Sequence, residues 1–134
     1  MSTISQPSIP LKGAPGSPYT RKMMAVMRYR RMPLRLIVSQ RGDHGGFPKP
    51  KVELLPTFYL PNAQGQIEAV TDSTPIIRRF EREVAGRSVI PQDPALRFLD
   101  ELIEDYGDEW LTKAMFHYRW AYKADIAKAA AQLP

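Results

Sequence analysis

The sequence predicts an α/β fold: a mixed four-stranded sheet with flanking helices, followed by two helices of an incomplete all-helical domain. Two observations lead to this class. A short apolar run, a helical period and a second apolar run open the chain as a strand, a helix and a strand. After a loop rich in glycine and proline, two more strand-like runs and a helical period follow, and the remaining apolar patterns are helical.

The first strand and the first helix meet at a turn of small residues. Residues 9–11 read as a short strand that ends at Gly13-Ala14-Pro15-Gly16. Ser17 is a favourable helix N-cap, a proline follows at the first helical position, and apolar residues recur at helical spacing as far as Arg31. Another proline ends this helix, and residues 34–38 form the second strand.

The start of this helix is also a candidate chemical site. The N–H groups of its first turn and the positive end of its dipole surround the Ser17 hydroxyl, an arrangement that stabilises a thiolate or another anion. Simple helix capping is the alternative interpretation, since Ser-Pro before a helix is common. The chain has no cysteine, which excludes disulfide exchange by its own side chains but is compatible with a bound thiol cofactor.

The middle of the chain predicts a loop, a hairpin and a second helix. Residues 40–51 contain too many glycines and prolines for a helix. Residues 54–60 and 67–70 read as paired strands around a turn. Residues 71–73 offer caps for a helix that ends at Gly86. We expect helices on both faces of the resulting sheet.

The tetrad Ser17-Pro18-Tyr19-Thr20 resembles the Cys-Pro-Tyr-Cys corner of glutaredoxins, with hydroxyl residues at both sulfur positions. Together with the order of elements over residues 7–85, it resembles the thioredoxin-like amino-terminal domain of glutathione transferases. The resemblance implies that the Ser17 hydroxyl donates a hydrogen bond to the glutathione sulfur and so lowers the pKa of the thiol. Thr20 and Tyr19 are the reserve candidates for this role.

The resemblance also implies roles at two other places. The family has a cis proline at the opening of its third strand, matched by Pro56, and the residue before it, Leu55, pairs its backbone with the cysteinyl part of glutathione. An acidic residue and a serine at the start of the next helix receive the γ-glutamyl carboxylate, which implies this role for Asp72 and Ser73. Without the resemblance, Pro56 would be expected in the trans form, and Asp72-Ser73 would be a helix cap only.

One part of the family pattern is missing. Between the second and third strands the family usually has a helix that contacts the glycyl end of glutathione, whereas this chain has the loop at residues 40–51. Lys49 or Lys51 could meet the glycyl carboxylate, but exposed loop lysines without such a role are the commoner case. The glycyl contacts therefore stay unassigned.

Composition and charge restrict the other classes of function. With 134 residues, 43% of them hydrophobic and 25% charged, the chain has the make-up of a single folded domain. No apolar run spans a bilayer and no secretory leader is present, so we expect a cytoplasmic protein with no membrane partner. The two histidines are far apart in sequence, so no metal site is expected.

The net charge of +5 raises the question of a nucleic-acid partner. Basic residues are dense only at Arg28, Arg30 and Arg31, which a solvated helix end explains, since cations suit a helix carboxyl terminus. Apart from Tyr29, aromatic residues do not alternate with these arginines as a set of stacking platforms would require. We therefore expect no nucleic-acid partner.

Three segments follow from these patterns. Residues 1–85 form the expected glutathione-binding domain, residues 86–94 a linker, and residues 95–134 the start of the family's helical second domain. Between Trp110 and Tyr122 apolar residues point in nearly every direction, so this helix should be buried on all sides. Because family members continue for several more helices, we expect either a fragment of a longer protein or a chain that self-associates.

The leading hypothesis is a glutathione S-transferase-like protein. It would take glutathione as co-substrate, stabilise the thiolate for conjugation to a small electrophile and form a homodimer. The alternative is a non-catalytic glutathione-binding or assembly module of the same fold, which the missing glycyl contacts favour. We expect weak or absent turnover, because the short carboxyl-terminal region leaves the electrophile pocket without a wall.

Overall fold

The computed structural model describes residues 7–132. The chain forms two compact units, residues 1–89 and 90–134, whose boundary falls inside the segment expected to be a linker. The first unit contains β1 (Ile9–Lys12), α1 (Pro18–Tyr29), β2 (Leu34–Ile37), β3 (Thr57–Pro61), β4 (Ile67–Val70) and α2 (Ser73–Glu83). The second contains α3 (Pro94–Asp105), a π-helical turn η1 (Tyr106–Trp110), α4 (Leu111–Ala121) and α5 (Lys123–Gln132).

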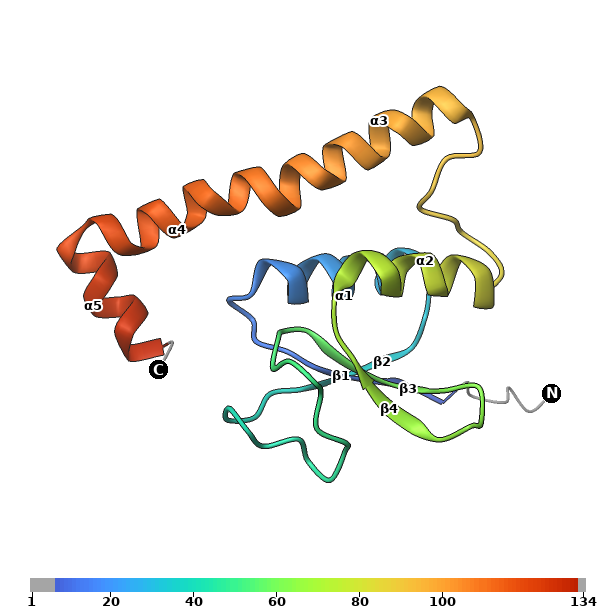
Figure 1. Cartoon of the computed structure of the whole chain (residues 1–134), viewed down its shortest axis with the longest axis horizontal. Helices are drawn as coiled ribbons and strands as arrows, with labels where there is room; N and C mark the ends of the chain where they lie inside the picture. Colours follow the sequence, from blue (N-terminus) through green and yellow to red (C-terminus); the bar gives the residue numbers. More distant parts are fainter. Residues whose placement is uncertain (1–6, 133–134) are drawn as a thin grey trace. The chain divides into compact units, whose positions relative to one another are not determined.

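The first unit is built on a mixed sheet with the strand order β2-β1-β3-β4 (Figure 1). β1 and β2 are parallel, whereas β3 runs antiparallel to both β1 and β4. The α/β class and the mixed four-stranded sheet expected from the sequence are confirmed.

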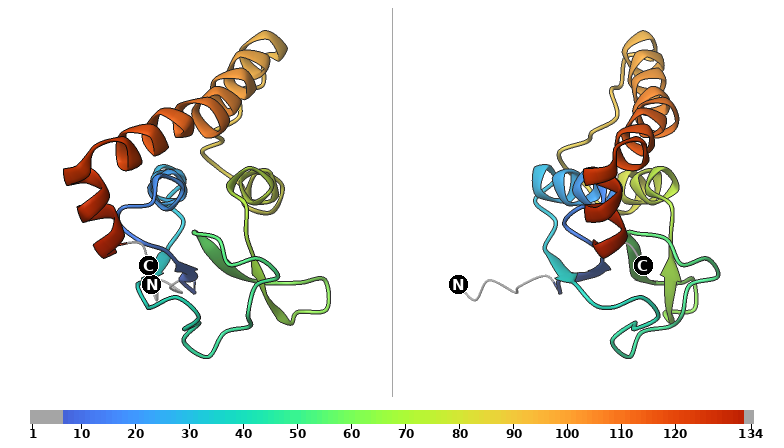
Figure 2. Two further views of the ribbon diagram at one scale, coloured as in Figure 1. Left: turned by 60° about the vertical axis from the view of Figure 1, so that its left-hand side comes forward. Right: turned by 90° about the vertical axis from the view of Figure 1, so that its left-hand side faces the viewer.

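Both helices of this unit lie on the same face of the sheet (Figure 2). Leu11 and Phe58 of the strands belong to one buried cluster with Met23 of α1 and with Ile76 and Phe80 of α2. The expectation of helices on both faces is therefore wrong. The segment that covers the opposite face is too rich in glycine and proline to form a helix.

That opposite face is covered by the loop of residues 38–56 (Figure 2). The ring of Phe47 stacks on Tyr59 of β3 with centroids 4.2 Å apart, and the guanidinium of Arg35 on β2 lies 5.7 Å from the Phe47 centroid. The loop thus covers a sheet face that a helix would otherwise cover. It does so with one aromatic stack and one cation–π contact.

β3 begins at Thr57 and not at Leu54. The Thr57 hydroxyl donates a hydrogen bond of 2.7 Å to the Leu54 carbonyl, which turns the chain before the strand. Pro56 has no N–H group to add to a ladder, so pairing starts only after it.

Arg30 departs from the solvated helix end expected for the three clustered arginines. Its side chain is 2% exposed and pairs with the carboxylate of Glu81 on α2. It also donates hydrogen bonds to the carbonyls of Phe80 and Val84. Arg30 therefore ties the end of α1 to the end of α2, while Arg28 and Arg31 are exposed.

The second unit is helical throughout its regular elements, and Gly107 does not interrupt it. The chain passes from α3 through η1 into α4 without a break, and α5 occupies the alanine-rich tail, to which the sequence reading assigned no helix. Six large apolar residues around α4 remain exposed in the described part of the chain: Trp110, Leu111, Phe116, Tyr118, Trp120 and Tyr122. None of the described helices is both long enough and apolar enough to cross a membrane.

Candidate functional site

The strand register brings three separated segments to one edge of the sheet. Lys12, the last residue of β1, pairs with Thr57, the first residue of β3, and Phe58 pairs with Val70, the last residue of β4. The turn after β1, the dipeptide before β3 and the start of α2 after β4 therefore all lie at this edge. It holds all five site residues expected from the sequence: Ser17, Leu55, Pro56, Asp72 and Ser73.

At this edge α1 starts as the sequence predicts. Ser17 is its N-cap in an extended conformation, and the N–H of Thr20 donates a hydrogen bond of 3.2 Å to the Ser17 hydroxyl oxygen. The hydroxyl uses only its acceptor capacity in this bond, so its proton can still be donated to another group. Capping and anion binding by Ser17 are therefore compatible.

Thr20, one reserve candidate, lies behind the turn. It is fully buried, and its hydroxyl accepts a hydrogen bond of 3.3 Å from the N–H of Ala14. A Cβ atom on Gly13 would lie 2.5 Å from the Thr20 methyl carbon, so only glycine allows this close approach. Thr20 thus fixes the turn from the inside, whereas Tyr19, the other reserve candidate, is partly exposed on α1.

The Leu55–Pro56 peptide is cis, as expected. Pro56 is buried and Leu55 is 38% exposed. Among the residues that the structure describes, no protein group forms a hydrogen bond with the backbone N–H or C=O of Leu55. This dipeptide therefore presents a main-chain donor and a main-chain acceptor next to the first residue of β3, which an extended ligand can pair with as a strand would.

The third segment is the start of α2. Asp72 is its N-cap, and the Asp72 carboxylate accepts a hydrogen bond of 3.3 Å from the N–H of Thr74. The φ of Asp72 is 80°, a conformation that costs a residue with a side chain roughly 1–3 kcal/mol. Ser73 follows as a buried first helical residue. The strained backbone of Asp72 therefore lies at the same sheet edge as the other two segments.

Lys22 also reaches this edge, although the sequence analysis did not single it out. Its ammonium group on α1 donates a hydrogen bond of 3.2 Å to the Ser73 hydroxyl oxygen. The residue lies five positions after Ser17 on the side of α1 that faces α2, and no local pattern in the sequence marked it. A positive charge thus stands beside the amino terminus of α2, where an anion is favoured.

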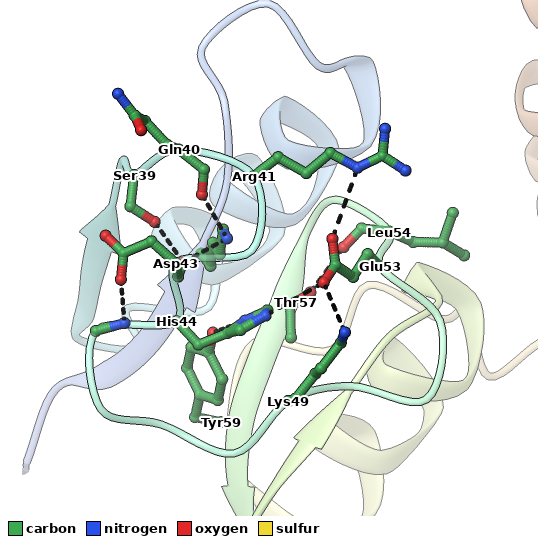
Figure 3. Close-up of polar contacts among 12 residues, drawn as sticks. Ser39, Gln40, Arg41, Asp43, His44, Lys49, Glu53, Leu54, Thr57 and Tyr59 are labelled. Atoms are coloured by element: carbon green, nitrogen blue, oxygen red, sulfur yellow. Dashed lines mark hydrogen bonds and ion pairs between the residues drawn. The ribbon is translucent and has the colours of Figure 1, made fainter. Parts of the chain in front are cut away.

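Figure 3 shows a polar cluster that ties the loop of residues 38–56 to the sheet. Nδ1 of His44 lies 3.3 Å from the Tyr59 hydroxyl, and Nε2 of His44 lies 3.5 Å from a carboxylate oxygen of Glu53. Lys49 and Arg41 approach the same carboxylate at 3.5 and 3.6 Å. Lys49, one of the lysines considered for the glycyl carboxylate, therefore already has an anionic partner, while Lys51 is exposed.

Two pKa values in this cluster are displaced. Burial, and after it the negative charge of Asp43, raises the pKa of the Tyr59 phenol above its ordinary value. Desolvation opposes ionisation of Glu53, but the charge of Lys49 and the contact with His44 outweigh it and hold the Glu53 pKa below its ordinary value of 4.5. Tyr59 is therefore a hydrogen-bond donor and Glu53 an anion at neutral pH.

The end of β1 is held to the same loop from the other side. Lys12 is buried, and its ammonium donates hydrogen bonds to the backbone carbonyls of Gln40 and Asp43. Within residues 7–132 the structure contains no group of three or more histidine, cysteine, aspartate and glutamate side chains suited to hold a metal ion.

Comparison with known proteins identifies the first unit. Residues 11–88 match the family described as "Glutathione S-transferase, N-terminal domain". Among solved structures, the chain is similar to the Tau class glutathione S-transferase MiGSTU from mango, Mangifera indica, with a TM-score of 0.64 and 17% identity, over 94% of this chain and 57% of that one. At this identity the likeness shows the fold, and the chain spans just over half the length of that transferase. A comparison with curated protein sequences finds no match.

Proposed function

The chain belongs to the glutathione S-transferase family, and we propose that it binds reduced glutathione at the sheet edge formed by Ser17, Leu55 and Ser73. In this proposal the cysteinyl sulfur lies at the amino terminus of α1, and the γ-glutamyl carboxylate lies at the amino terminus of α2. The protein stabilises the glutathione thiolate for attack on a small electrophile.

The single observation that supports this proposal most strongly is the unpaired main chain of Leu55 in the described structure. A tripeptide such as glutathione can pair its cysteinyl N–H and C=O with the carbonyl and N–H of Leu55. The register sets this dipeptide at the same sheet edge as the turn that leads into Ser17. The pairing therefore directs the cysteinyl side chain toward the Ser17 hydroxyl.

The chemistry proposed for Ser17 is stabilisation of charge. Its hydroxyl donates a hydrogen bond to the sulfur, and the first-turn N–H groups and dipole of α1 add a positive potential, so the pKa of the bound thiol falls. The thiol proton leaves to solvent, and the thiolate sulfur then forms a bond to the electrophilic carbon while a leaving group departs with its electron pair. No side chain has to act as a general base.

The γ-glutamyl carboxylate is proposed to bind at Ser73 and Lys22. The Ser73 hydroxyl donates a hydrogen bond, the amino terminus of α2 contributes its dipole, and the Lys22 ammonium, 3.2 Å from that hydroxyl, adds a full positive charge. Asp72 fixes the turn that aims these donors. Because glutathione is kept reduced in the cytoplasm, the proposal places the protein there.

A non-catalytic glutathione-binding or assembly module is the second candidate function. It is favoured by the loop of residues 38–56, which replaces the helix that carries the glycyl contacts in the family. The chain covers 57% of the length of the similar transferase. Activity on an electrophile is therefore part of the proposal and is not carried over from that protein.

We extend the proposal to a homodimer formed through the second unit. Its exposed apolar side chains, such as Tyr118 at 63% exposed, need a cover. Residues 94–110 hold one basic and six acidic residues, and residues 111–128 hold four basic and one acidic. Two copies packed antiparallel therefore bring the acidic half of each against the basic half of the other, which favours a second copy as the partner.

Calorimetric titration with reduced glutathione, run beside a conjugation assay with a small aryl halide, separates the candidates. Binding with turnover supports the transferase, and binding without turnover supports the module. If no heat of binding is detected at millimolar glutathione, both the transferase and a glutathione-binding module are wrong.

A further inference from the structure

We propose that His44 is a positioning residue for the glutathione site: by bridging Tyr59 and Glu53 it holds the segment that presents the Leu55 main chain. This inference rests on the proposed function, because it concerns how that site is kept in shape. It assigns a role to the loop of residues 38–56, whose contacts the family resemblance leaves open.

The bridge starts inside the sheet. Tyr59 is 1% exposed in the middle of β3, where Phe47 stacks on its ring, so the position of its hydroxyl is fixed by the sheet. The His44 side chain is 10% exposed and places Nδ1 3.3 Å from that hydroxyl. Of the residues that approach Glu53, only His44 is itself anchored to the sheet, since Lys49 and Arg41 are 74% and 78% exposed.

The direction of the hydrogen bonds follows from the two ends of the bridge. Because the Tyr59 phenol keeps its proton at neutral pH, we assign it as the hydrogen-bond donor and Nδ1 of His44 as the acceptor. Nε2 then carries the ring proton and faces the ionised Glu53 carboxylate at 3.5 Å. This buried nitrogen forms no hydrogen bond within the described structure, and the Glu53 carboxylate at 3.5 Å meets it as an electrostatic partner.

Because Glu53 is only two residues before Leu55, fixing the position of Glu53 also restricts the position of Leu55. Leu54 lies between them, and its carbonyl accepts the hydrogen bond from the Thr57 hydroxyl. Pro56 is buried on the other side. Leu55 is therefore held between two anchors, Glu53 before it and Pro56 after it, while its own N–H and C=O form no hydrogen bond within the described structure.

Ser17 and His44 therefore have different roles in the proposed site. Ser17 acts on the sulfur, whereas His44 acts only through the placement of Leu55. Loss of the bridge should therefore weaken glutathione binding without changing the pKa of the thiol once glutathione is bound. A general loosening of the fold would change both quantities.

The experiment compares His44→Leu, which removes both polar contacts, with His44→Gln, whose amide can accept from Tyr59 and donate to Glu53. His117→Leu, a matched change in the second unit, is the control. The Kd for reduced glutathione is measured by calorimetry, and the thiol pKa of bound glutathione is measured by ultraviolet thiolate absorbance at saturation. Hydrogen exchange of the amides in residues 40–56 is followed in the same variants.

We expect His44→Leu to raise Kd about tenfold, His44→Gln to stay within about threefold of wild type, and His117→Leu to match wild type. The bound thiol pKa should be the same in all four proteins, and exchange should speed up in residues 40–56 of His44→Leu but not in α1 or α2. An unchanged Kd in His44→Leu overturns the positioning role, and so does an equal loss in His44→Gln. Wild-type protein that binds no glutathione overturns the proposed function and this role together, and the wild-type titration distinguishes that case.

Discussion

The ammonium group of Lys22 on α1 donates a hydrogen bond over 3.2 Å to the Ser73 hydroxyl at the start of α2. This contact joins the amino-terminal ends of two helices that begin 55 residues apart in sequence. Each helix end favours an anion through the positive end of its dipole. The Lys22 side chain therefore adds a mobile charge to a fixed arrangement of dipoles.

Replacing Lys22 by methionine should weaken glutathione binding, because the charge beside the proposed carboxylate position is lost. The length of the side chain stays similar. Hydrogen bonds to charged groups contribute about 1.5–3 kcal/mol, so we expect Kd to rise about tenfold or more. Arg21→Met, which removes the exposed neighbouring charge on α1, is the control and should change Kd little. Equal losses in the two variants would mean that only the general positive field matters.

The lowered pKa of Glu53 predicts a pH dependence of stability. Because the folded-state pKa lies below the unfolded value, the contribution of Glu53 is fully present above that unfolded value and is lost as the pH falls through the folded one. Wild-type protein should therefore lose more unfolding free energy than Glu53→Gln as the pH drops from neutral to well below 4.5. Denaturant titrations at several pH values measure this difference, and parallel curves for the two proteins would contradict it.

The buried pair of Arg30 and Glu81 predicts a strong stability effect. Glu81→Ala leaves the 2% exposed Arg30 side chain without its carboxylate partner, which typically costs about 3–5 kcal/mol. Glu83→Ala is the matched control on the same helix, since Glu83 pairs with Arg79 at 2.8 Å on the surface and such pairs contribute about 0–1 kcal/mol. The unfolding midpoints of both variants test the pair, and equal shifts would rule out a special role for Arg30.

The proposed homodimer predicts that charge reversal in the second unit dissociates it. Lys113→Glu/Lys123→Glu and Asp105→Lys/Glu109→Lys should each be monomeric at micromolar concentration, because each places like charges opposite one another in an antiparallel pair. Mixing the two variants should restore the dimer, which light scattering detects. A wild-type protein that is monomeric and does not aggregate would contradict the dimer itself.

Local sequence signals predicted most of the first unit. Ser17 followed by proline marked the start of α1, and the apolar period marked its buried face. The order of strands and helices along the sequence predicted the mixed sheet. What failed was the placement of helices on both faces, because no local pattern states which face a crossover covers. The burial of Arg30 was also missed, since its partner Glu81 is 51 residues away.

The candidate site shows the same limit. Ser17 and Asp72 stand at helix caps, where single residues have a local signature, whereas the cis form of Pro56 was expected from the family resemblance alone. Lys22 and His44 have no local signature, because their partners Ser73, Tyr59 and Glu53 meet them only after the sheet has formed. Polar contacts that depend on the tertiary fold were therefore invisible to sequence reasoning, although they shape the same edge of the sheet.

The central claim, that the sheet edge binds glutathione and that Ser17 stabilises its thiolate, is tested most directly by the pH titration of bound glutathione in wild type and Ser17→Ala. Asp93→Ala is the control, because Asp93 caps α3 through the N–H of Leu96 as Ser17 caps α1, and loss of such a cap costs about 0.5–2 kcal/mol of stability. The account predicts one saturable glutathione per chain, a bound thiol pKa below that of free glutathione in wild type and Asp93→Ala, and a return toward the free value in Ser17→Ala. A bound thiol that titrates alike in wild type and Ser17→Ala would contradict it.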